Sequence, residues 1–331
     1  MKKKLIAMLL SAAMCLSLAA CGQKADTPDT TDPAEPSGDA ATYTVGICQL
    51  VQHEALDAAT QGFIDALNEA LPGQVKFEEK NASGDSNSCA TIVNGFVSEG
   101  VDLIMANATA ALQAAASATS DIPVLGTSIT AYGVALDIDD FSGTVGGNVS
   151  GTSDLADLSK QADMITEWFP ETQKVGLLFC SAEPNSRYQI DEVRKALEAQ
   201  GVTCEEFAFT DSNDVSSVTQ KAADFSDVVY IPTDNTAASN TEAIANVLIP
   251  AGVPAICGEE GLCRGCGVAT LSISYYDLGV TTGKMAAKIL KGEANISEMP
   301  VEYTDATPKY NASICDQLGI TPLDGYEAIE G

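Results

Sequence analysis

Short apolar runs alternate with amphipathic segments along the chain from residue 43. Residues 43–50 form the first apolar run, which predicts a strand. Apolar side chains then recur every four positions from Ala55 to Leu71, which marks one face of a helix that ends at Pro72-Gly73. The same pattern predicts strands at 75–77, 101–105 and 122–125, with helices at 89–97 and 110–118. Strands that alternate with helices in this way indicate a parallel sheet with helical crossovers.

The alternation restarts after a long helix that we expect over residues 153–168, and the glycine-rich stretch 143–151 before it indicates a turn near a hinge. The pattern then predicts strands and intervening helices, with the strands at 174–180, 202–209, 228–231 and 253–257. Two such series indicate an α/β protein of two similar lobes. Because a helix at 276–290 and a strand at 301–303 follow, we expect discontinuous lobes: 42–158 plus 272–300, and 159–271 plus 301–331.

The first residues have the pattern of an export signal. Three lysines at positions 2–4 precede an apolar stretch over 5–20, which is shorter than the roughly 20 apolar residues that a membrane-spanning helix needs. The stretch ends in Leu18-Ala19-Ala20-Cys21-Gly22, which resembles a bacterial lipobox. We therefore predict a lipoprotein signal peptide at 1–21, lipid attachment at Cys21, and an extracytoplasmic protein anchored to the bacterial cell membrane. An ordinary signal peptide with an incidental cysteine is the alternative.

Residues 22–41 have the composition of a disordered tether. They are rich in Thr, Pro, Asp, Ala, Gly and Ser and contain no aromatic or long aliphatic side chain. Such a segment buries too little apolar surface to offset the entropy lost on ordering. We expect it to hold the folded lobes near the membrane without inserting into it.

The charge of the chain excludes some partners. It contains 46 acidic and 17 basic residues, which gives a formal net charge of -29 at pH 7. No basic stripe is available to neutralise phosphates, so we expect no nucleic acid partner and no electrostatic binding to an anionic bilayer.

The chain contains ten cysteines, and the sequence leaves open the chemistry of one cluster among them. Two of the ten fall in the signal region, and Cys263 and Cys266 lie close in sequence to Cys257. This cluster is compatible with a disulfide, half of a zinc site or a redox pair. A zinc site usually needs a second pair of ligands, and the single histidine, His53, lies far away in sequence, so we expect no metal.

In open parallel sheets, ligands bind beyond the carboxyl ends of the strands. This rule places a site in segments that are polar and begin helices: 49–54, 81–83, 107–109, 127–130, 181–186, 233–236 and 258–261. Helix N-termini favour a carboxylate, whereas Glu183 and Asp234 are available to an ammonium group. The site therefore suits a zwitterion, although helix capping explains each polar residue equally well.

A series of motifs occurs in the order found in one known family. The segment 49–57 with Gly62-Phe63 resembles the opening of the ABC-transporter substrate-binding family that includes tryptophan- and tyrosine-binding lipoproteins. Further similar segments follow in order: Asn81-Ala82, Gly84-Asp85, 106–110, 147–151, 183–186, 232–236 and 275–279. The resemblance as a whole covers the chain from about Val45 to Pro322. The resemblance implies the type I periplasmic-binding-protein clamshell, in which two Rossmann-like lobes are joined by several crossovers.

The resemblance also implies a function and a set of site residues. It implies an ABC importer with a permease and an ATPase as partners, an aromatic amino acid as the solute, no cofactor and no enzymatic activity. The expected ligand-binding residues are Leu50, His53, Asn81, Thr109, Ser128, Tyr132, Glu183, Asn185, Ser186, Asp234 and Asn235.

Within that set we assign a role to each part of the solute. The carboxylate is expected at Thr109, Asn185 and Ser186, and the ammonium group at Asp234 or Glu183. The solute's side chain is expected against Leu50 and His53, with Tyr132 or Tyr188 beside it.

One loop of the chain departs from the family pattern. The loop Thr130-Ala131-Tyr132 stands where the family commonly has Thr-Asp-Pro, which could change the preferred solute.

A clamshell that senses another small solute for a signalling receptor is the alternative function. An enzyme would need His53 as its base, and the sequence places no nucleophile beside it.

Overall fold

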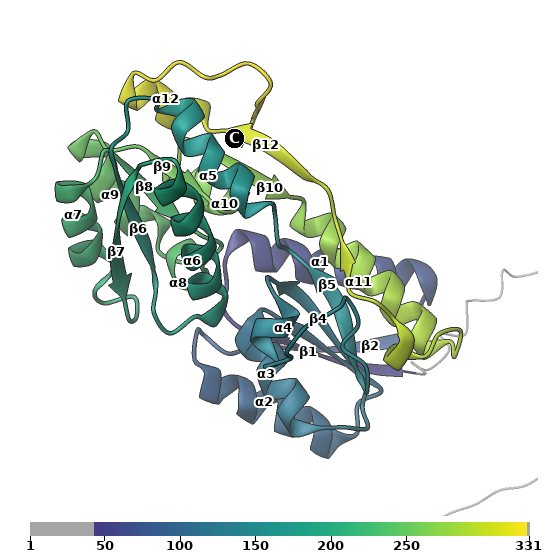
Figure 1. The fold of residues 1–331 in the computed structure, drawn as a ribbon. Helices are drawn as coiled ribbons and strands as arrows, with labels where there is room; N and C mark the ends of the chain where they lie inside the picture. The colour runs from purple at the N-terminus through teal and green to yellow at the C-terminus, as the bar shows by residue number, and fades with distance from the viewer. Residues whose placement is uncertain (1–42, 330–331) are drawn as a thin grey trace, which may run out of the picture. The chain divides into compact units, whose positions relative to one another are not determined.

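The computed structural model describes residues 43–329. The expected signal peptide, with Cys21, and the expected tether lie outside these described residues. The described chain forms two α/β lobes, each built on its own sheet with helices on both faces (Figure 1). The predicted two-lobed α/β architecture is therefore confirmed.

The first lobe is built on a six-stranded sheet in the order β11-β5-β4-β3-β1-β2, with all strand pairs parallel. Its strands are β1 (Tyr43–Gln49), β2 (Val75–Asn81), β3 (Leu103–Asn107), β4 (Val124–Ile129), β5 (Val149–Ser153) and β11 (Glu302–Tyr303). Alternate residues of the central strands enter two separate cores. Val45 and Ile47 pack in one core, and Cys48 packs in the other. Burial on both faces explains why these strands are nearly continuous apolar runs.

Helices cover both faces of the first sheet. α1 (Glu54–Ala70) and α11 (Tyr275–Leu290) pack on one face, and α2 (Ser86–Glu99) and α3 (Thr109–Ala118) pack on the other. The short helix α4 (Tyr132–Ala135) follows β4. Local sequence sets these limits: the Asp85 side chain accepts hydrogen bonds from two N–H groups at the start of α2, and Gly100 ends that helix in the left-handed conformation.

The second lobe is built on a seven-stranded sheet in the order β13-β12-β10-β9-β8-β6-β7. Its strands are β6 (Lys174–Cys180), β7 (Thr203–Phe209), β8 (Val228–Ile231), β9 (Ala255–Cys257), β10 (Ala269–Ile273), β12 (Ala306–Tyr310) and β13 (Glu327–Ala328). The pair of β10 and β12 is antiparallel, and the other pairs are parallel.

The helices of the second lobe also divide between two cores. α5 (Leu158–Trp168) and α6 (Pro184–Ala199) pack in one core, and α7 (Val215–Phe225), α9 (Thr241–Ala251) and α10 (Glu260–Cys266) pack in the other. Three short helices complete the described chain: α8 (Asn235–Ala238), η1 (Ile296–Glu298) and α12 (Ala312–Leu318).

One expected helix begins later than predicted, and its first residue, Ser153, belongs to a strand. The prediction of a helix over 153–168 is wrong in its first part, because β5 occupies Val149–Ser153 and α5 begins only at Leu158. Gly151 has a φ of 145°, and a Cβ there would lie 2.0 Å from the Gly126 carbonyl oxygen. The stretch expected to be a hinge turn therefore contributes a closely paired strand. The Asp157 side chain then caps α5.

Three segments connect the two lobes. They are residues 154–157 between β5 and α5, Ser274 between β10 and α11, and residues 304–305 between β11 and β12. Residues 301–331 were expected in the second lobe, but β11 pairs with β5 in the first sheet. The chain therefore passes into the second lobe only after Tyr303, through the third connecting segment.

No described helix is long and apolar enough to cross a membrane. The eight cysteines between residues 43 and 329 are free thiols, and Cys257, Cys263 and Cys266 are buried in one core of the second lobe. Among the described residues, no group of three or more His, Cys, Asp or Glu side chains is placed to hold a metal ion.

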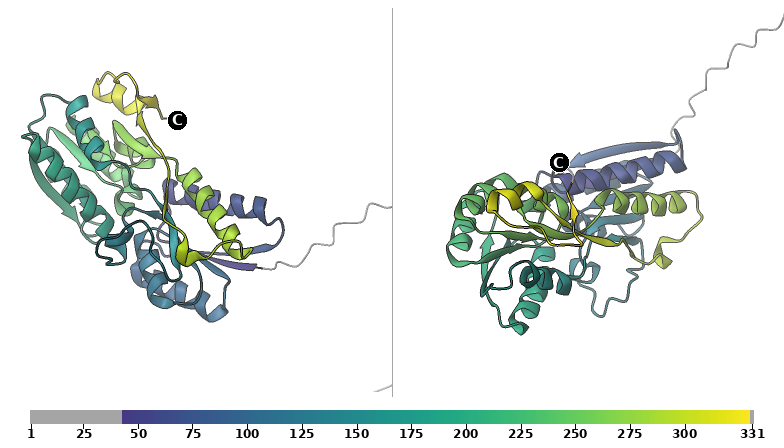
Figure 2. Two further views of the ribbon diagram at one scale, coloured as in Figure 1. Left: turned by 45° about the vertical axis from the view of Figure 1, so that its right-hand side comes forward. Right: turned by 90° about the horizontal axis from the view of Figure 1, so that it is seen from above.

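Helices α1 and α11 lie against each other with their backbones in contact (Figures 1 and 2). A Cβ on Gly279 would lie 2.0 Å from the Ala59 carbonyl oxygen, and one on Gly62 would lie 2.1 Å from the Tyr276 carbonyl oxygen. Glycine at these positions therefore allows the helix that returns from the second lobe to dock on the first.

We expect Gly279→Ala to lower the free energy of unfolding by roughly 3 kcal/mol, because the added methyl group forces two backbones apart. Urea unfolding of the mature domain measures this change. Gly95→Ala in α2 is the matched control, since nothing lies within 4 Å of its Cβ position and alanine stabilises a helix by about 0.5–1 kcal/mol relative to glycine. A Gly279→Ala variant as stable as the control would contradict the close contact.

Candidate functional site

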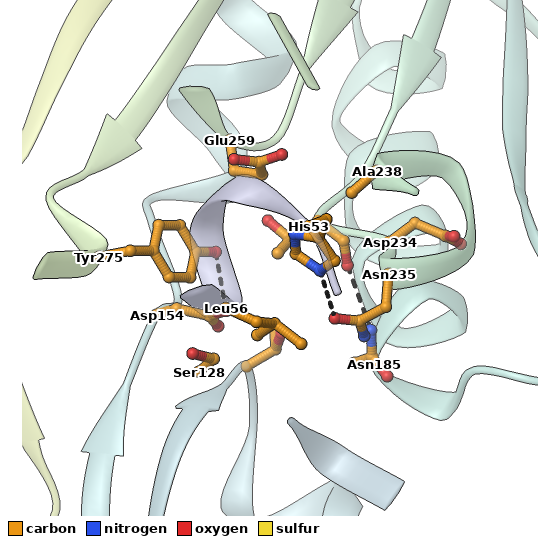
Figure 3. Close-up of a pocket in the computed structure, with 12 residues that line it drawn as sticks. His53, Leu56, Ser128, Asp154, Asn185, Asp234, Asn235, Ala238, Glu259 and Tyr275 are labelled. Carbon is orange, nitrogen blue, oxygen red and sulfur yellow. Dashed lines mark hydrogen bonds between the residues drawn. The ribbon is translucent and has the colours of Figure 1, made fainter. Parts of the chain in front are cut away.

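A cavity lies where the carboxyl ends of the two sheets face each other (Figure 3). The first lobe contributes Ser128 from the end of β4 and residues that follow β1, β4 and β5, and the second lobe contributes residues that follow β6, β8 and β9. Tyr275 enters from the crossover into α11. The lining residues are His53, Leu56, Ser128, Thr130, Asp154, Asn185, Thr233, Asp234, Asn235, Ala238, Glu259 and Tyr275.

The cavity is narrow in this structure. The cavity volume open to the centre of a water-sized sphere is only about 10 Å³. This is close to the minimum needed to hold one water molecule. An amino acid is far larger. A solute can therefore enter only if the two lobes separate, which is the hinge motion expected of two domains joined by a few crossing segments.

On one side of the cavity, Asp154 and Tyr275 form a buried pair. Both residues stand at crossovers, Asp154 directly after β5 and Tyr275 at the start of α11. The Tyr275 hydroxyl donates a 2.9 Å hydrogen bond to Asp154 Oδ2. Asp154 Oδ1 is buried and has no hydrogen-bond partner among the described residues. Burial raises the pKa of Asp154 to about 6, although the hydroxyls of Tyr275 and Thr130 oppose the rise.

On the opposite side, His53 of the first lobe meets Asn235 of the second (Figure 3). His53 Nε2 lies 3.2 Å from Asn235 Oδ1, so this contact bridges the lobes. His53 Nδ1 and the Ser128 hydroxyl are buried without a partner among the described residues. These two polar groups, together with Asp154 Oδ1, therefore retain hydrogen-bonding capacity that a solute could use.

The two carboxylates expected to receive an ammonium group are engaged elsewhere. Asp234 Oδ2 accepts a 2.6 Å hydrogen bond from the Cys180 N–H, and Oδ1 accepts one of 2.8 Å from the Ala237 N–H. Both oxygens of Glu183 accept from groups at the start of α8. These residues hold β6 and α8 together, as the capping alternative predicted. Glu259 likewise accepts from two N–H groups of α10.

The remaining predicted residues divide between the cavity lining and its surroundings. The structure brings His53, Ser128, Asn185, Asp234 and Asn235 to the lining. It does not bring Leu50, Asn81, Thr109, Tyr132, Glu183 or Ser186 there.

Each residue outside the lining has another environment. Leu50 and Tyr132 are in the core of the first lobe, where the Tyr132 hydroxyl donates to the Gly126 and Thr152 carbonyl oxygens. Neither side chain lines the cavity. Other polar residues are placed as follows: Thr109 is buried at the start of α3, exposed Asn81 accepts from the Ser83 N–H, and buried Ser186 accepts from Asn185. Tyr188 lines a separate groove beside α5.

Sequence reasoning missed Asp154 and six other lining residues for identifiable reasons. Thr130, Thr233 and Glu259 lie in segments that the strand-end rule selected, but they were not chosen within them. Asp154 lies in a segment for which the sequence predicts a helix, so the strand-end rule does not select it. Had β5 been recognised, the same rule would have selected the residue that follows it. Leu56, Ala238 and Tyr275 gave no chemical signal of their own.

The electrostatics of the cavity favour a positive group. Among the described residues that line it, none is Lys or Arg, whereas three are Asp or Glu. Burial raises the pKa of Glu259 to about 7, and burial together with Glu183 raises the pKa of Asp234. A raised carboxyl pKa means that the closed cavity disfavours the negative form. A cationic group of a solute would reverse that penalty.

Comparison with known families and proteins gives consistent matches over most of the chain. Residues 44–325 match the model of a family described as ABC transporter substrate binding protein. A tyrosine-binding protein of Clostridioides difficile (strain R20291) is 30% identical over 312 residues, which cover 92% of this chain and 89% of the relative.

Two solved structures also resemble the fold. An ABC domain from Streptococcus pneumoniae in complex with L-Trp is 32% identical, with a TM-score of 0.82 over 88% of this chain and 100% of that one. A ligand-free, open substrate-binding protein with adhesive properties from Clostridium difficile is also 32% identical, but its TM-score is 0.66 over 87% of this chain and 99% of that one. At equal identity, the structure is thus more similar to the complex with ligand than to the open form, which agrees with the narrow cavity.

We expect Asp234→Ala to lower the free energy of unfolding by roughly 2 kcal/mol or more, because it leaves two buried N–H groups without an acceptor. Asp234→Asn keeps one acceptor oxygen and should cost less. Urea unfolding of the three proteins measures the difference. Unchanged stability in the alanine variant, combined with loss of solute binding, would instead show that Asp234 contacts the solute.

Proposed function

Because this chain belongs to the family of ABC transporter substrate-binding proteins, we propose that it captures an aromatic amino acid outside the cytoplasm and delivers it to an ABC importer. The family resemblance and the clamshell fold expected from the sequence are both confirmed. So is the expectation that the chain is not an enzyme, since this family binds solutes. The importer, the aromatic solute and the lipid anchor are parts of the proposal.

The observation that carries the proposal is the unpartnered oxygen of Asp154. Its side chain is buried against the cavity, and Oδ2 accepts from Tyr275, whereas Oδ1 makes no hydrogen bond among the described residues. The Thr130 hydroxyl lies near enough to lower the pKa of the carboxyl. An ammonium group is the solute feature that supplies both a donor and a positive charge at such a site. We therefore assign the amino group of the solute to Asp154, in place of Asp234 or Glu183.

Other lining residues suit the remaining parts of an aromatic amino acid. The Ser128 hydroxyl can donate to a carboxylate. Leu56 is an apolar side chain in the lining, and the Tyr275 ring supplies a flat surface. The relatives support an aromatic solute, because one is a tyrosine-binding protein and another was solved with L-Trp.

Closure is the step that connects binding to transport. A solute that contacts both lobes favours the closed arrangement by its difference in affinity for the closed and open forms. Asp154 stands on one crossover and Tyr275 on another, so a solute held there acts directly on the hinge. The closed lobes are then the form presented to the permease, and its ATPase supplies the energy for transport.

We expect Asp154→Asn to weaken binding of tryptophan, tyrosine and phenylalanine by at least about 100-fold. The reason is that the charge-assisted hydrogen bond is lost and a neutral amide faces the ammonium group. Hydrogen bonds to charged groups contribute about 1.5–3 kcal/mol each, and the lost attraction between the carboxylate and the ammonium group lowers the binding free energy further. Isothermal titration of the ligand-free mature domain measures the three affinities.

Asp139→Asn is the control for that experiment, because it makes the same charge change at an exposed position. Deaminated analogues of the three amino acids should bind the wild type and Asp154→Asn equally weakly. If Asp154→Asn retains wild-type affinity, the assignment of the amino group is wrong. If the wild type binds none of the three amino acids, the aromatic solute itself is wrong.

The lipid anchor is proposed from residues 18–22, since the Cys21 thiol stands where a lipobox places its lipidated cysteine. We expect Cys21→Ser to move the protein from the membrane fraction to the soluble extracytoplasmic fraction, because one serine hydroxyl cannot form the thioether to lipid. Cell fractionation followed by immunoblotting measures the distribution. Cys48→Ser, at a buried cysteine of the first lobe, is the matched control. A Cys21→Ser protein that remains at the membrane would contradict lipidation at this residue.

A further inference from the structure

Glu183 fixes the orientation of the Asn235 amide. Its Oε1 accepts 2.8 Å hydrogen bonds from the N–H and the hydroxyl of Thr236, and its Oε2 accepts from the N–H of Asn235 at 3.0 Å. Every one of these neighbours is a donor, so the carboxylate acts as an acceptor throughout. The Asn235 side chain approaches Oε2 at 2.7 Å. An amide oxygen in that place would face a carboxylate oxygen, so the NH2 group must be the part that faces Glu183.

The amide orientation in turn fixes the proton on His53. With its NH2 group on Glu183, Asn235 turns Oδ1 toward His53 Nε2, 3.2 Å away. Because Oδ1 is an acceptor, Nε2 must carry the proton. Burial lowers the pKa of His53, while the bond to Asn235 and the charge of Glu183 oppose this. In the neutral ring, Nδ1 then presents a lone pair.

That lone pair has no partner in the described part of the chain. His53 Nδ1 is buried, makes no hydrogen bond there, and belongs to a side chain that lines the cavity. Figure 3 shows the ring across the cavity from Asp154 and Tyr275. Besides the Ser128 hydroxyl, the described lining thus has two acceptors without a donor on opposite sides, one charged and one neutral. A buried acceptor of this kind favours a ligand that brings a donor to it.

We propose that His53 Nδ1 accepts a hydrogen bond from the side chain of the solute and so selects tyrosine or tryptophan over phenylalanine. This inference rests on the proposed function, in which Asp154 holds the amino group. With the ammonium group on Asp154, the donor left for the opposite side is the phenol O–H or the indole N–H. Phenylalanine has neither, and it would leave Nδ1 buried and unpaired.

The selecting contact is assembled by closure. His53 precedes α1 in the first lobe, whereas Asn235 and Glu183 belong to the second. The tautomer with its proton on Nε2 is therefore stabilised only when the lobes meet. A solute with a matching donor stabilises the same closed arrangement, so selection and closure favour each other.

The tautomer can be measured directly, because His53 is the single histidine of the chain. Labelling histidine with 15N gives the signals of one ring, provided that the protein is purified without a histidine tag. In the complex with tyrosine we expect the proton on Nε2, and an Nδ1 signal displaced toward that of a hydrogen-bonded nitrogen. With phenylalanine we expect the same tautomer without the Nδ1 displacement. A proton on Nδ1, or equal displacements with both solutes, would overturn the proposal.

Affinity measurements test the same proposal by another route. We expect the wild type to bind tyrosine or tryptophan on the order of 10- to 100-fold more tightly than phenylalanine, and His53→Phe to remove that preference. His53→Phe should fold, since the His53 side chain makes no capping hydrogen bond to α1. Thermal unfolding checks this, and Gln52→Ala, at an exposed neighbouring position, is the matched control.

The outcomes separate this proposal from the proposed function. If the wild type binds the three aromatic amino acids with equal affinity, or if His53→Phe retains the preference, the role of His53 is wrong and the aromatic-solute function stands. If His53→Phe weakens all three equally, His53 contacts a part that they share, and selection by its side-chain contact is again wrong. If the wild type binds none of them, both proposals fail.

Discussion

Burying several carboxylates between two lobes costs free energy that donors must offset, and this constraint organises the site. Asp234, Glu183 and Glu259 all accept from backbone N–H groups at the starts of α8 or α10. Asp234 also accepts from the Cys180 N–H at the end of β6, and Glu183 also accepts from side chains. Those bonds join strand ends to the helices that follow, so the second-lobe loops are held in place before any solute arrives. Asp154 differs, because one of its oxygens has a tyrosine hydroxyl and the other has no described partner. The same chemistry therefore yields three structural carboxylates and one that can serve a solute.

The positions of these groups connect recognition to motion. Asp154 and Tyr275 stand on two crossovers, so their hydrogen bond ties together the segments about which the lobes must turn. Across the cavity, Glu183 orients Asn235, and Asn235 orients His53, which reaches the second lobe from the first. The backbone contact between α1 and α11 at Gly62 and Gly279 lies within the first lobe. A change in the angle between the lobes therefore leaves this contact intact.

Much of the fold follows from local patterns. The β1 and β6 runs are apolar on both faces because parallel strands are covered by helices on both sides. The strand-end rule located the site, since carboxyl ends of parallel strands meet along one edge of a sheet. Prediction failed at β5, where Gly151 and small polar residues give no apolar strand signal; pairing with β4 and the close approach to Gly126 decide that segment. With β5 unrecognised, Asp154 could not be identified as a strand-end residue.

The sequence by itself determined the alternation of strands and helices, the acidic character and the family resemblance, because these depend on the order and type of residues. It also limited the site to a few polar segments. The tertiary structure decided which residues line the cavity, and which of them have a hydrogen-bonding atom without a partner in the described chain. Asp234 and Asp154 are the same kind of residue, and only the number of donors around each one distinguishes a helix cap from a free acceptor. That number depends on residues distant in sequence, such as Cys180 for Asp234 and Tyr275 for Asp154, and no local pattern contains it.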